Sequence, residues 1–401
     1  MYIKRDNEAS IRKISDQSQT LLINGPRLVG KSTLLNHIDP DRPTVSLDML
    51  TIREQALFNP KGFLQRSPGP LLIKSIENAP ELLPVIKSIA DERQKSGWLW
   101  LTANQQFRRL ENALRSLGCR IQVLRLLGLS QRELNRWLGG GPFLPTEDYL
   151  KSCRGRRKLE SKEIFHFIWK GSYPKIWKGD VDWEYFYNSY FQELLERDVC
   201  RFTKITSELD LFRFARIVAQ SIGQPINHSA LAAKAGISQP KAKAWLSVLE
   251  DFGLIYLLPA YCSTRHKRVI KSSKLYFTDT GLAAFLSGWL IEQAIEPGIM
   301  GEAFLENFAV IEILKSYRNA GLEPSLFYYP DTDGREIDLI IEEHGKLFPV
   351  GIKNTDKPRA AMIKNFEVLP RDLRGCGSLL CLVKEETPLS SEVSAIPFFY
   401  L

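Results

Sequence analysis

Residues 20–33 read Thr20-Leu-Leu-Ile-Asn-Gly25-Pro-Arg-Leu-Val-Gly30-Lys31-Ser32-Thr33. The apolar run Leu21–Ile23 predicts a short buried strand, and residues 33–38 predict a helix. Between them, residues 25–32 match the phosphate-binding pattern G-x-x-x-x-G-K-[ST] at every fixed position. A strand, this loop and a helix in that order predict a nucleotide-binding α/β domain.

The spacing within this loop has a chemical reason. The two glycines allow backbone N–H groups to surround a polyphosphate, Lys31 neutralises the β- and γ-phosphate oxygens, and Ser32 offers its hydroxyl to Mg²⁺. We therefore expect ATP as the ligand, with Mg²⁺ as its companion ion. The expected contact residues are Gly25, Pro26, Arg27, Leu28, Val29, Gly30, Lys31, Ser32 and Thr33.

The composition sets the class of protein. A chain of 401 residues predicts two to four domains, and 44% hydrophobic and 25% charged residues are typical of a globular protein. The longest apolar runs are too short to cross a membrane, and no signal peptide is recognisable. The six cysteines form no C-x-x-C pair, so we expect no zinc site, no disulfide and a cytoplasmic location. The net charge of +8 suits an acidic partner such as nucleic acid.

The first 140 residues show strands alternating with helices. Further strands are predicted over residues 43–47, 71–73, 98–102 and 120–126, and helices over 80–94 and 105–117. This alternation predicts a parallel sheet covered by helices on both faces, the fold class of a P-loop αβα domain. We expect this domain to span residues 1–140.

Several motifs together resemble a large bacterial and archaeal family of AAA-type ATPases in which a domain of uncharacterised function follows the ATPase core. They cover nearly the whole chain and are Gly25–Leu34, Ala79–Pro84, Leu101–Phe107, Leu127–Leu134, Gly171–Pro174, Tyr190–Asp198, Lys274–Leu282, Gly301–Phe308 and Arg335–Ile341. The resemblance implies ATP binding by the loop.

The chain departs from this family at the end of the third strand. There the family has Asp-Glu, one acid for the Mg²⁺ hydration shell and one to polarise the attacking water, whereas this chain has Lys74 and Ser75. We therefore expect nucleotide binding without efficient hydrolysis. The acids that could compensate are Asp48 and Glu77. Two further candidates are Asn104, as a sensor of the γ-phosphate, and Arg120, as a finger acting in trans; each also fits an ordinary surface residue.

The middle of the chain predicts two units. Residues 141–205 form a helical, basic connecting region, whose charged run 151–158 we interpret as solvated, with a nucleic-acid patch as the alternative. Residues 206–290 predict a winged helix-turn-helix with residues 239–252 as its recognition helix. Its contacts to double-stranded DNA would come from Lys241, Lys243, Arg265, Lys267 and Arg268. Use of the same fold for protein contacts is the alternative.

Residues 291–401 predict an α/β domain of the restriction-endonuclease-like (PD-(D/E)xK) type. Asp338 and Lys353 match its catalytic positions, but Gly351 stands where a metal-binding Glu is needed. Glu302 or Glu306 could supply the missing carboxylate. We expect this domain to be inactive as a nuclease.

These features lead to one main hypothesis and two alternatives. The main hypothesis is an ATP-binding AAA-type protein in which the nucleotide acts as a conformational or assembly switch, with DNA and further copies of the chain as partners. The first alternative is an active ATPase or ATP-dependent nuclease that uses displaced acids. The second is a protein-interaction scaffold with a vestigial nucleotide site.

Overall fold

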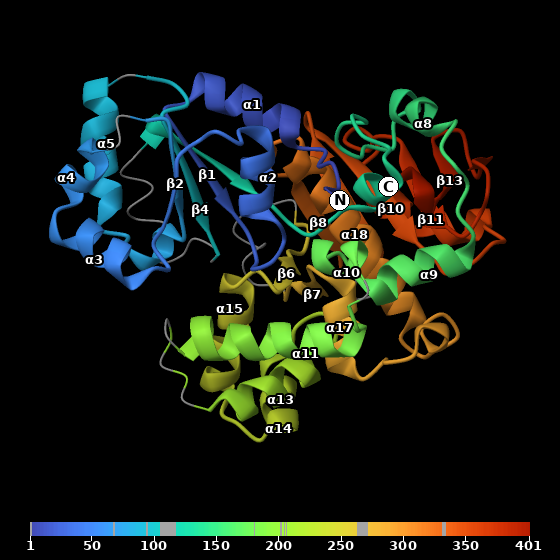
Figure 1. Cartoon of the computed structure of the whole chain (residues 1–401). Coiled ribbons are helices and arrows are strands. Elements are labelled where there is room, and N and C mark those ends of the chain that lie inside the picture. The colour runs from blue at the N-terminus through green and yellow to red at the C-terminus, as the bar shows by residue number, and fades with distance from the viewer. Residues whose placement is uncertain are drawn as a thin grey trace.

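The computed structural model describes residues 2–66, 69–93, 95–104, 118–179, 181–200, 203, 205, 207–262, 272–330 and 334–401. Figure 1 shows an N-terminal and a C-terminal α/β part side by side, with a group of helices beneath them. Within the described ranges, every helix is too short or too polar to span a membrane.

The N-terminal part is a five-stranded sheet in the order β2-β3-β4-β1-β5, and every neighbouring pair is parallel. This confirms the predicted parallel sheet. Its strands are β1 (Thr20–Asn24), β2 (Thr44–Ser46), β3 (Leu71–Lys74), β4 (Leu99–Ala103) and β5 (Ile121–Arg125). Its helices are α1 (Glu8–Gln17), α2 (Lys31–Ile38), α3 (Leu50–Phe58), α4 (Pro60–Gln65) and α5 (Leu82–Arg93). The helix predicted over 105–117 lies outside the described residues.

Both faces of this sheet are covered, which explains why β1 is apolar along its length. All five residues of β1 are buried. Leu21 and Ile23 belong to the core that contains α1 and α2, whereas Leu22 belongs to the core that contains α5. Successive side chains of a strand point to opposite faces, so one short run supplies both cores.

The middle of the chain is largely helical. It comprises α7 (Gln131–Asn135), α8 (Glu147–Cys153), α9 (Ser161–Lys170), α10 (Pro174–Lys178), α11 (Trp183–Glu193), η3 (Leu194–Val199), α13 (Glu208–Ala219), α14 (His228–Ala235), α15 (Gln239–Asp251), α17 (Thr280–Ser287) and η4 (Glu292–Ala294). The antiparallel strands β6 (Ile255–Leu258) and β7 (Lys274–Phe277) follow α15. The segment η3 continues α11 as a π-helix.

The basic run 151–158 is largely exposed, as expected, but two of its arginines also contact the C-terminal part. Arg156 donates to the backbone carbonyls of Phe399 (3.1 Å) and Tyr400 (3.0 Å). Arg154 forms an ion pair with Glu386 at 3.0 Å. The run packs against the last residues of the chain because those residues offer carbonyl and carboxylate oxygens to its guanidinium groups.

The C-terminal part is a six-stranded mixed sheet in the order β12-β13-β11-β10-β9-β8. Its elements are α18 (Gly301–Asn319), β8 (Ser325–Tyr329), β9 (Ile337–Glu343), β10 (Lys346–Ile352), η5 (Ala360–Val368), β11 (Gly377–Cys381), β12 (Thr387–Pro388), β13 (Val393–Pro397) and η6 (Phe398–Tyr400). Residues Ala360–Val368 form a 3₁₀ helix.

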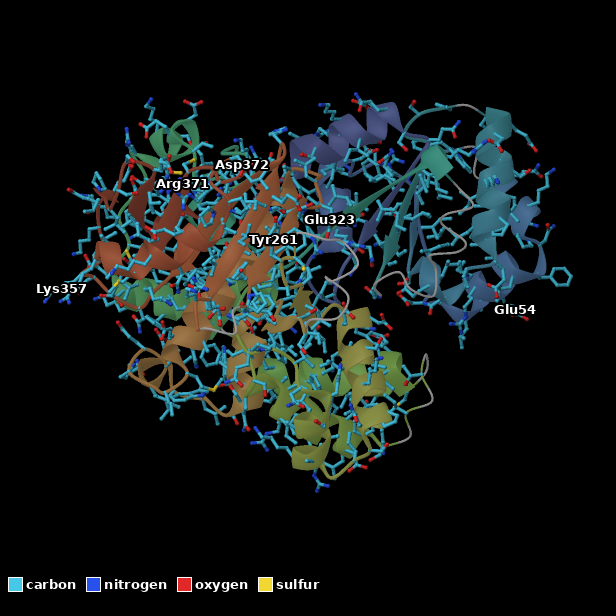
Figure 2. The ribbon with its side chains drawn as sticks, turned by 180° about the vertical axis from the view of Figure 1, so that it is seen from behind. Glu54, Tyr261, Glu323, Lys357, Arg371 and Asp372 are labelled. Carbon is cyan, nitrogen blue, oxygen red and sulfur yellow. The ribbon has the colours of Figure 1, made fainter. Side chains whose placement is uncertain are left out.

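The two α/β parts contact each other directly. Arg125, at the end of β5, pairs with Glu323 at 3.0 Å, and Figure 2 shows Glu323 at the junction between the parts. Deeper in the interface, buried Glu312 accepts from the Gln131 amide at 2.7 Å, and Lys315 donates to the Leu129 carbonyl at 2.9 Å. Helix α18 therefore anchors the segment that follows β5.

One buried carboxylate joins three distant segments of the middle region. Asp279 accepts from the amide and the hydroxyl of Ser172 (both 2.6 Å), from the Tyr187 hydroxyl (2.7 Å) and from the Leu282 amide (2.7 Å). A Cβ atom at Gly171 or Gly281 would lie 2.0 or 2.2 Å from the Tyr187 hydroxyl oxygen, so both positions require glycine. This network gives a physical reason for the residues of the 171–174 and 274–282 motifs.

We expect Asp279→Ala to destabilise the fold by about 4 kcal/mol, because the substitution leaves several buried donors without an acceptor. The midpoint of urea unfolding measures the loss. Asp182→Ala is the matched control, since Asp182 caps α11 through a single bond to the Tyr185 amide and should cost about 1 kcal/mol. Equal costs for the two variants would contradict the role given to Asp279.

Candidate functional site

The predicted phosphate-binding loop connects β1 to α2 at the carboxyl edge of the parallel sheet. A Cβ atom at Gly25 would lie 2.0 Å from the Leu126 carbonyl oxygen, so the end of β5 requires glycine there. Gly30 has a φ of 97°, in the left-handed region, and immediately precedes α2. Gly25 is therefore required because the end of β5 approaches it closely. Gly30 is required because its backbone is left-handed.

A buried ion pair supports the loop from below. Arg5 binds Glu133 at 2.9 Å and donates to the carbonyls of Val29 (3.1 Å) and Leu127 (2.8 Å). Glu133 also completes a capping box with Ser130. No pattern in the sequence indicated Arg5, because its carboxylate partner lies 128 residues away.

Lys31 is buried at the start of α2. Its ammonium donates to the carbonyls of Gly25 (2.8 Å) and Pro26 (2.6 Å), so it lies across the loop. Burial lowers the pKa of Lys31, and the nearby charge of Glu77 opposes this effect. An anion in the loop would supply the countercharge that the buried ammonium lacks.

Glu77, one of the two compensating acids considered, lies inside the site. It belongs to η1 (Ile76–Asn78), which follows Ser75, a residue with a left-handed φ of 60°. Its Oε1 accepts from the Asn104 amide at 3.2 Å, and its buried Oε2 has no hydrogen-bond partner among the described residues. Burial raises the pKa of Glu77 despite the opposing charge of Lys31. Asn104 thus contacts Glu77 through its backbone.

Asp48, the other compensating acid, is exposed beside the position of the missing acids. Its carboxylate accepts from the Ser75 hydroxyl at 2.9 Å and from the Asn78 side-chain amide at 2.9 Å. The strand order explains why Asp48 contacts Ser75 and Asn78, because β2, β3 and β4 are adjacent and their carboxyl ends share one edge. Asp48, Glu77 and Asn104 therefore lie at the same edge of the sheet.

Arg27 of the loop is held by two acids that the sequence did not indicate. Its guanidinium contacts Glu193 at 3.0 Å and both Asp198 oxygens at 3.1 Å. Burial raises the pKa of Asp198, and Arg27 opposes this effect. These acids lie 166 and 171 residues beyond Arg27, and no local pattern signals such a distant pairing.

Arg120 lies elsewhere. It immediately precedes β5, at the amino edge of the sheet, and pairs with Asp91 at the end of α5. The phosphate-binding loop is at the opposite edge, so Arg120 does not reach the loop of its own chain.

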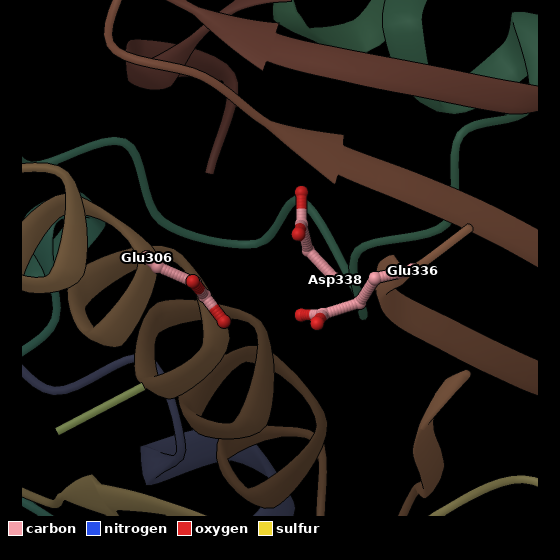
Figure 3. Close-up of side chains that lie close together, drawn as sticks. All are labelled: Glu306, Glu336 and Asp338. Carbon is pink, nitrogen blue, oxygen red and sulfur yellow. The ribbon is translucent and has the colours of Figure 1, made fainter. Parts of the chain in front are cut away.

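A second cluster of acids lies in the C-terminal part (Figure 3). Carboxylate oxygens of Glu306, Glu336 and Asp338 lie within 4.8 Å of one another. The Lys274 ammonium binds Glu306 at 2.8 Å and also pairs with Glu336, and the Tyr276 hydroxyl donates to Glu306 at 2.5 Å. Burial lowers the pKa of Lys274, but Glu306 and Glu336 outweigh it and the net pKa is raised. The cluster therefore already contains a cation.

The predicted nuclease residues lie beside this cluster. Lys353 is 3.5 Å from Asp338 and 3.6 Å from Glu302. At Gly351, a Cβ atom would lie 2.9 Å from Leu379 Cδ1, so a side chain there would require the Leu379 side chain to shift. Of the two substitutes considered, Glu306 joins the cluster and Glu302 pairs with Lys353. Glu336 was missed, although its position two residues before Asp338 was a usable signal.

The expected DNA-contacting residues are only partly described. Lys241 and Lys243 are exposed on α15, and the Lys241 ammonium lies 4.5 Å from the centre of the Trp245 ring. Arg265, Lys267 and Arg268 lie outside the described residues.

Comparison with known proteins agrees with the loop geometry. Residues 17–135 match a family described as AAA domain. Residues 161–292 and 301–401 match two families described as domains of unknown function, DUF8612 and DUF4143. Similar curated proteins are the uncharacterized proteins Rv2008c of Mycobacterium tuberculosis and Mb2031c of Mycobacterium bovis. Each is 24% identical over 405 residues, covering 98% of this chain and 83% of the relative.

Three solved structures show distant likenesses. The STAND ATPase PH0952 of Pyrococcus horikoshii has a TM-score of 0.26 at 12% identity, over 80% of this chain and 47% of that one, so the chain spans about half of it. A variant of RuvB from Thermotoga maritima has a TM-score of 0.30 at 16% identity. The match covers 66% of this chain and 91% of that one. The structure of Drosophila ORC bound to AT-rich DNA and Cdc6 has a TM-score of 0.21 at 11% identity. The match covers 71% of this chain and 90% of that one. At these TM-scores the likenesses carry no argument about function.

The family match and the loop lead to the same assignment. Residues 17–135 contain a parallel sheet, a complete phosphate-binding loop at its carboxyl edge and a buried lysine at the start of the following helix. This N-terminal part of the chain is an α/β domain with a phosphate-binding loop, and it is similar to AAA domains.

Proposed function

We propose that the protein binds ATP with Mg²⁺ and uses binding, rather than turnover, as a conformational or assembly switch. The observation that carries this proposal is the buried Lys31 in an intact loop. The site also fits the metal, because Ser32 follows Lys31 and Glu77 Oε2, which no described residue binds, is nearby. Ser32, Asp48 and Glu77 would hold the ion, which would neutralise phosphate charge.

The residues at the end of β3 argue against efficient turnover. Lys74 adds a positive charge where a carboxylate would hold Mg²⁺ water, and Ser75 donates to Asp48 instead of activating water. The site retains groups that hold phosphate and has lost those that normally direct water at it.

Binding and turnover on one purified sample test the switch. We expect a fluorescent ATP analogue to bind wild type, Lys31→Ala to weaken binding at least about 100-fold because a buried charge-assisted contact is lost, and phosphate release to stay at background. Lys61→Ala is the control, since Lys61 is an exposed lysine of α4. Rapid phosphate release by wild type would contradict the switch, and absence of binding would leave the scaffold alternative.

Glu77 favours a second candidate function, slow ATP hydrolysis with a displaced acid. It is 8% exposed, lies close enough to Lys31 to affect its pKa, and contacts the end of β4. A buried carboxylate with a raised pKa and one oxygen that no described residue binds is suited to accept a proton from water.

If Glu77 has this role, Glu77→Gln should lower phosphate release by at least about 100-fold at saturating ATP and Mg²⁺. Glu81→Gln, at an exposed position nearby, is the control. Equal phosphate release by the two variants would exclude Glu77 as the catalytic base.

For residues 206–290 we propose a winged helix that associates with double-stranded DNA. Three helices followed by an antiparallel pair of strands support this, as do the exposed Lys241 and Lys243 on α15. Binding of a protein partner by the same surface, including a further copy of the chain, is the alternative.

Titration of a DNA duplex at several salt concentrations tests this proposal. We expect affinity to fall with salt, and the double variant Lys241→Ala/Lys243→Ala to bind more weakly with a salt slope smaller by about 2. Lys357→Ala/Lys364→Ala removes the same charge from an exposed part of the C-terminal region and is the control. Identical losses for both pairs would indicate a net-charge effect and contradict recognition by α15.

For residues 291–401 we propose a nuclease-like fold without cleavage activity. The Lys274 ammonium supports this, because it binds Glu306 and Glu336, two of the three carboxylates that a metal would need. The missing carboxylate at Gly351 supports it independently.

A further inference from the structure

Arg27 gives the phosphate-binding loop a connection to the helical middle of the chain. Its guanidinium contacts Glu193 through one nitrogen and both oxygens of Asp198 through another. The contact is sheltered, since the Arg27 and Asp198 side chains are only 21% and 10% exposed. A guanidinium held on two edges has few donors left for a phosphate.

The acids come from an unusual stretch of helix. Glu193 is the last residue of α11, and Asp198 belongs to the π-helical segment η3 that continues it. π-helical turns are rare and occur mostly at functional sites. This segment contacts Arg27, which is the only charged residue among residues 25–28.

A nucleotide would compete directly with these acids. Its phosphates need the cations of the loop, and the charge of Asp198 acts on Lys31 as well as on Arg27. Glu193, Asp198, Asp48 and Glu77 all place negative charge around the loop, so an arriving triphosphate is repelled unless some of that charge moves away.

We propose that Glu193 and Asp198 form an acidic clamp that competes with bound nucleotide for Arg27, so that nucleotide binding releases η3 from the loop. This inference rests on the proposed nucleotide binding and identifies the element that responds to it.

The packing around α11 indicates which helices would move when η3 is released from the loop. Phe191, one turn before η3, packs on Phe212 of α13 with ring centroids 5.6 Å apart. Phe214 of α13 in turn packs on Trp245 of α15 at 5.6 Å. Movement of η3 would therefore reach the helix that presents Lys241 and Lys243.

Asp198→Asn tests the clamp, because it removes the charge and keeps the shape. We expect this full-length variant to bind a fluorescent ATP analogue about tenfold more tightly than wild type. Glu193→Gln should act in the same direction and guards against a folding defect in one variant. Glu196→Gln is the control, since Glu196 is exposed on η3 and accepts a hydrogen bond from Gln192, one turn earlier.

Hydrogen exchange of amides 190–200 provides a second readout. Nucleotide should increase exchange there in wild type and have little further effect in Asp198→Asn, where the segment is already loosened. Binding by Asp198→Asn but not by wild type would also support the clamp.

Two results would overturn the clamp while leaving nucleotide binding intact. One is equal affinity of wild type and Asp198→Asn with unchanged exchange. The other is weaker binding by Asp198→Asn only when Mg²⁺ is present, which would make Asp198 a metal ligand. If no variant binds nucleotide, the proposed function and the clamp both fail.

Discussion

The buried carboxylate of Asp279 holds the middle region of the chain in its arrangement. It joins the turn at residue 172, helix α11 through Tyr187, and the start of α17. The site is buried, so the Ser172 and Leu282 donors depend on this acceptor, and the surrounding glycines allow the three segments to approach closely. Without Asp279 the segments would have no common point of attachment.

This arrangement also sets the surroundings of the nucleotide loop. Pro174, two residues beyond Ser172, lies against Gly30 of the loop, 3.6 Å from the Cβ position that Gly30 lacks. Helix α11, fixed at Tyr187, carries Glu193 at its far end to Arg27. The loop is therefore contacted on two sides by segments that Asp279 holds, which couples it to the helices beneath the sheet.

Two sites in the chain bring acidic residues together in different ways. At the end of β3, Lys74 replaces an acid, and the remaining acids, Asp48 and Glu77, come from neighbouring connections of the sheet. In the C-terminal part the acids persist, and Lys274 from β7 binds two of them, Glu306 and Glu336. The positive charge inside this second cluster therefore comes from the chain itself.

Local spacing and the order of elements were enough to predict the strand, loop and helix of the nucleotide site, the parallel sheet and the loss of the acids at Lys74 and Ser75. They also indicated Asp48 and Glu77, since the carboxyl ends of parallel strands share one edge. Folding alone established that Arg5 supports the loop, that Asp198 holds Arg27 and that Lys274 binds Glu306. The partners in these three contacts are 32 to 171 residues apart, and spacing along a chain carries no record of which distant residues folding brings together.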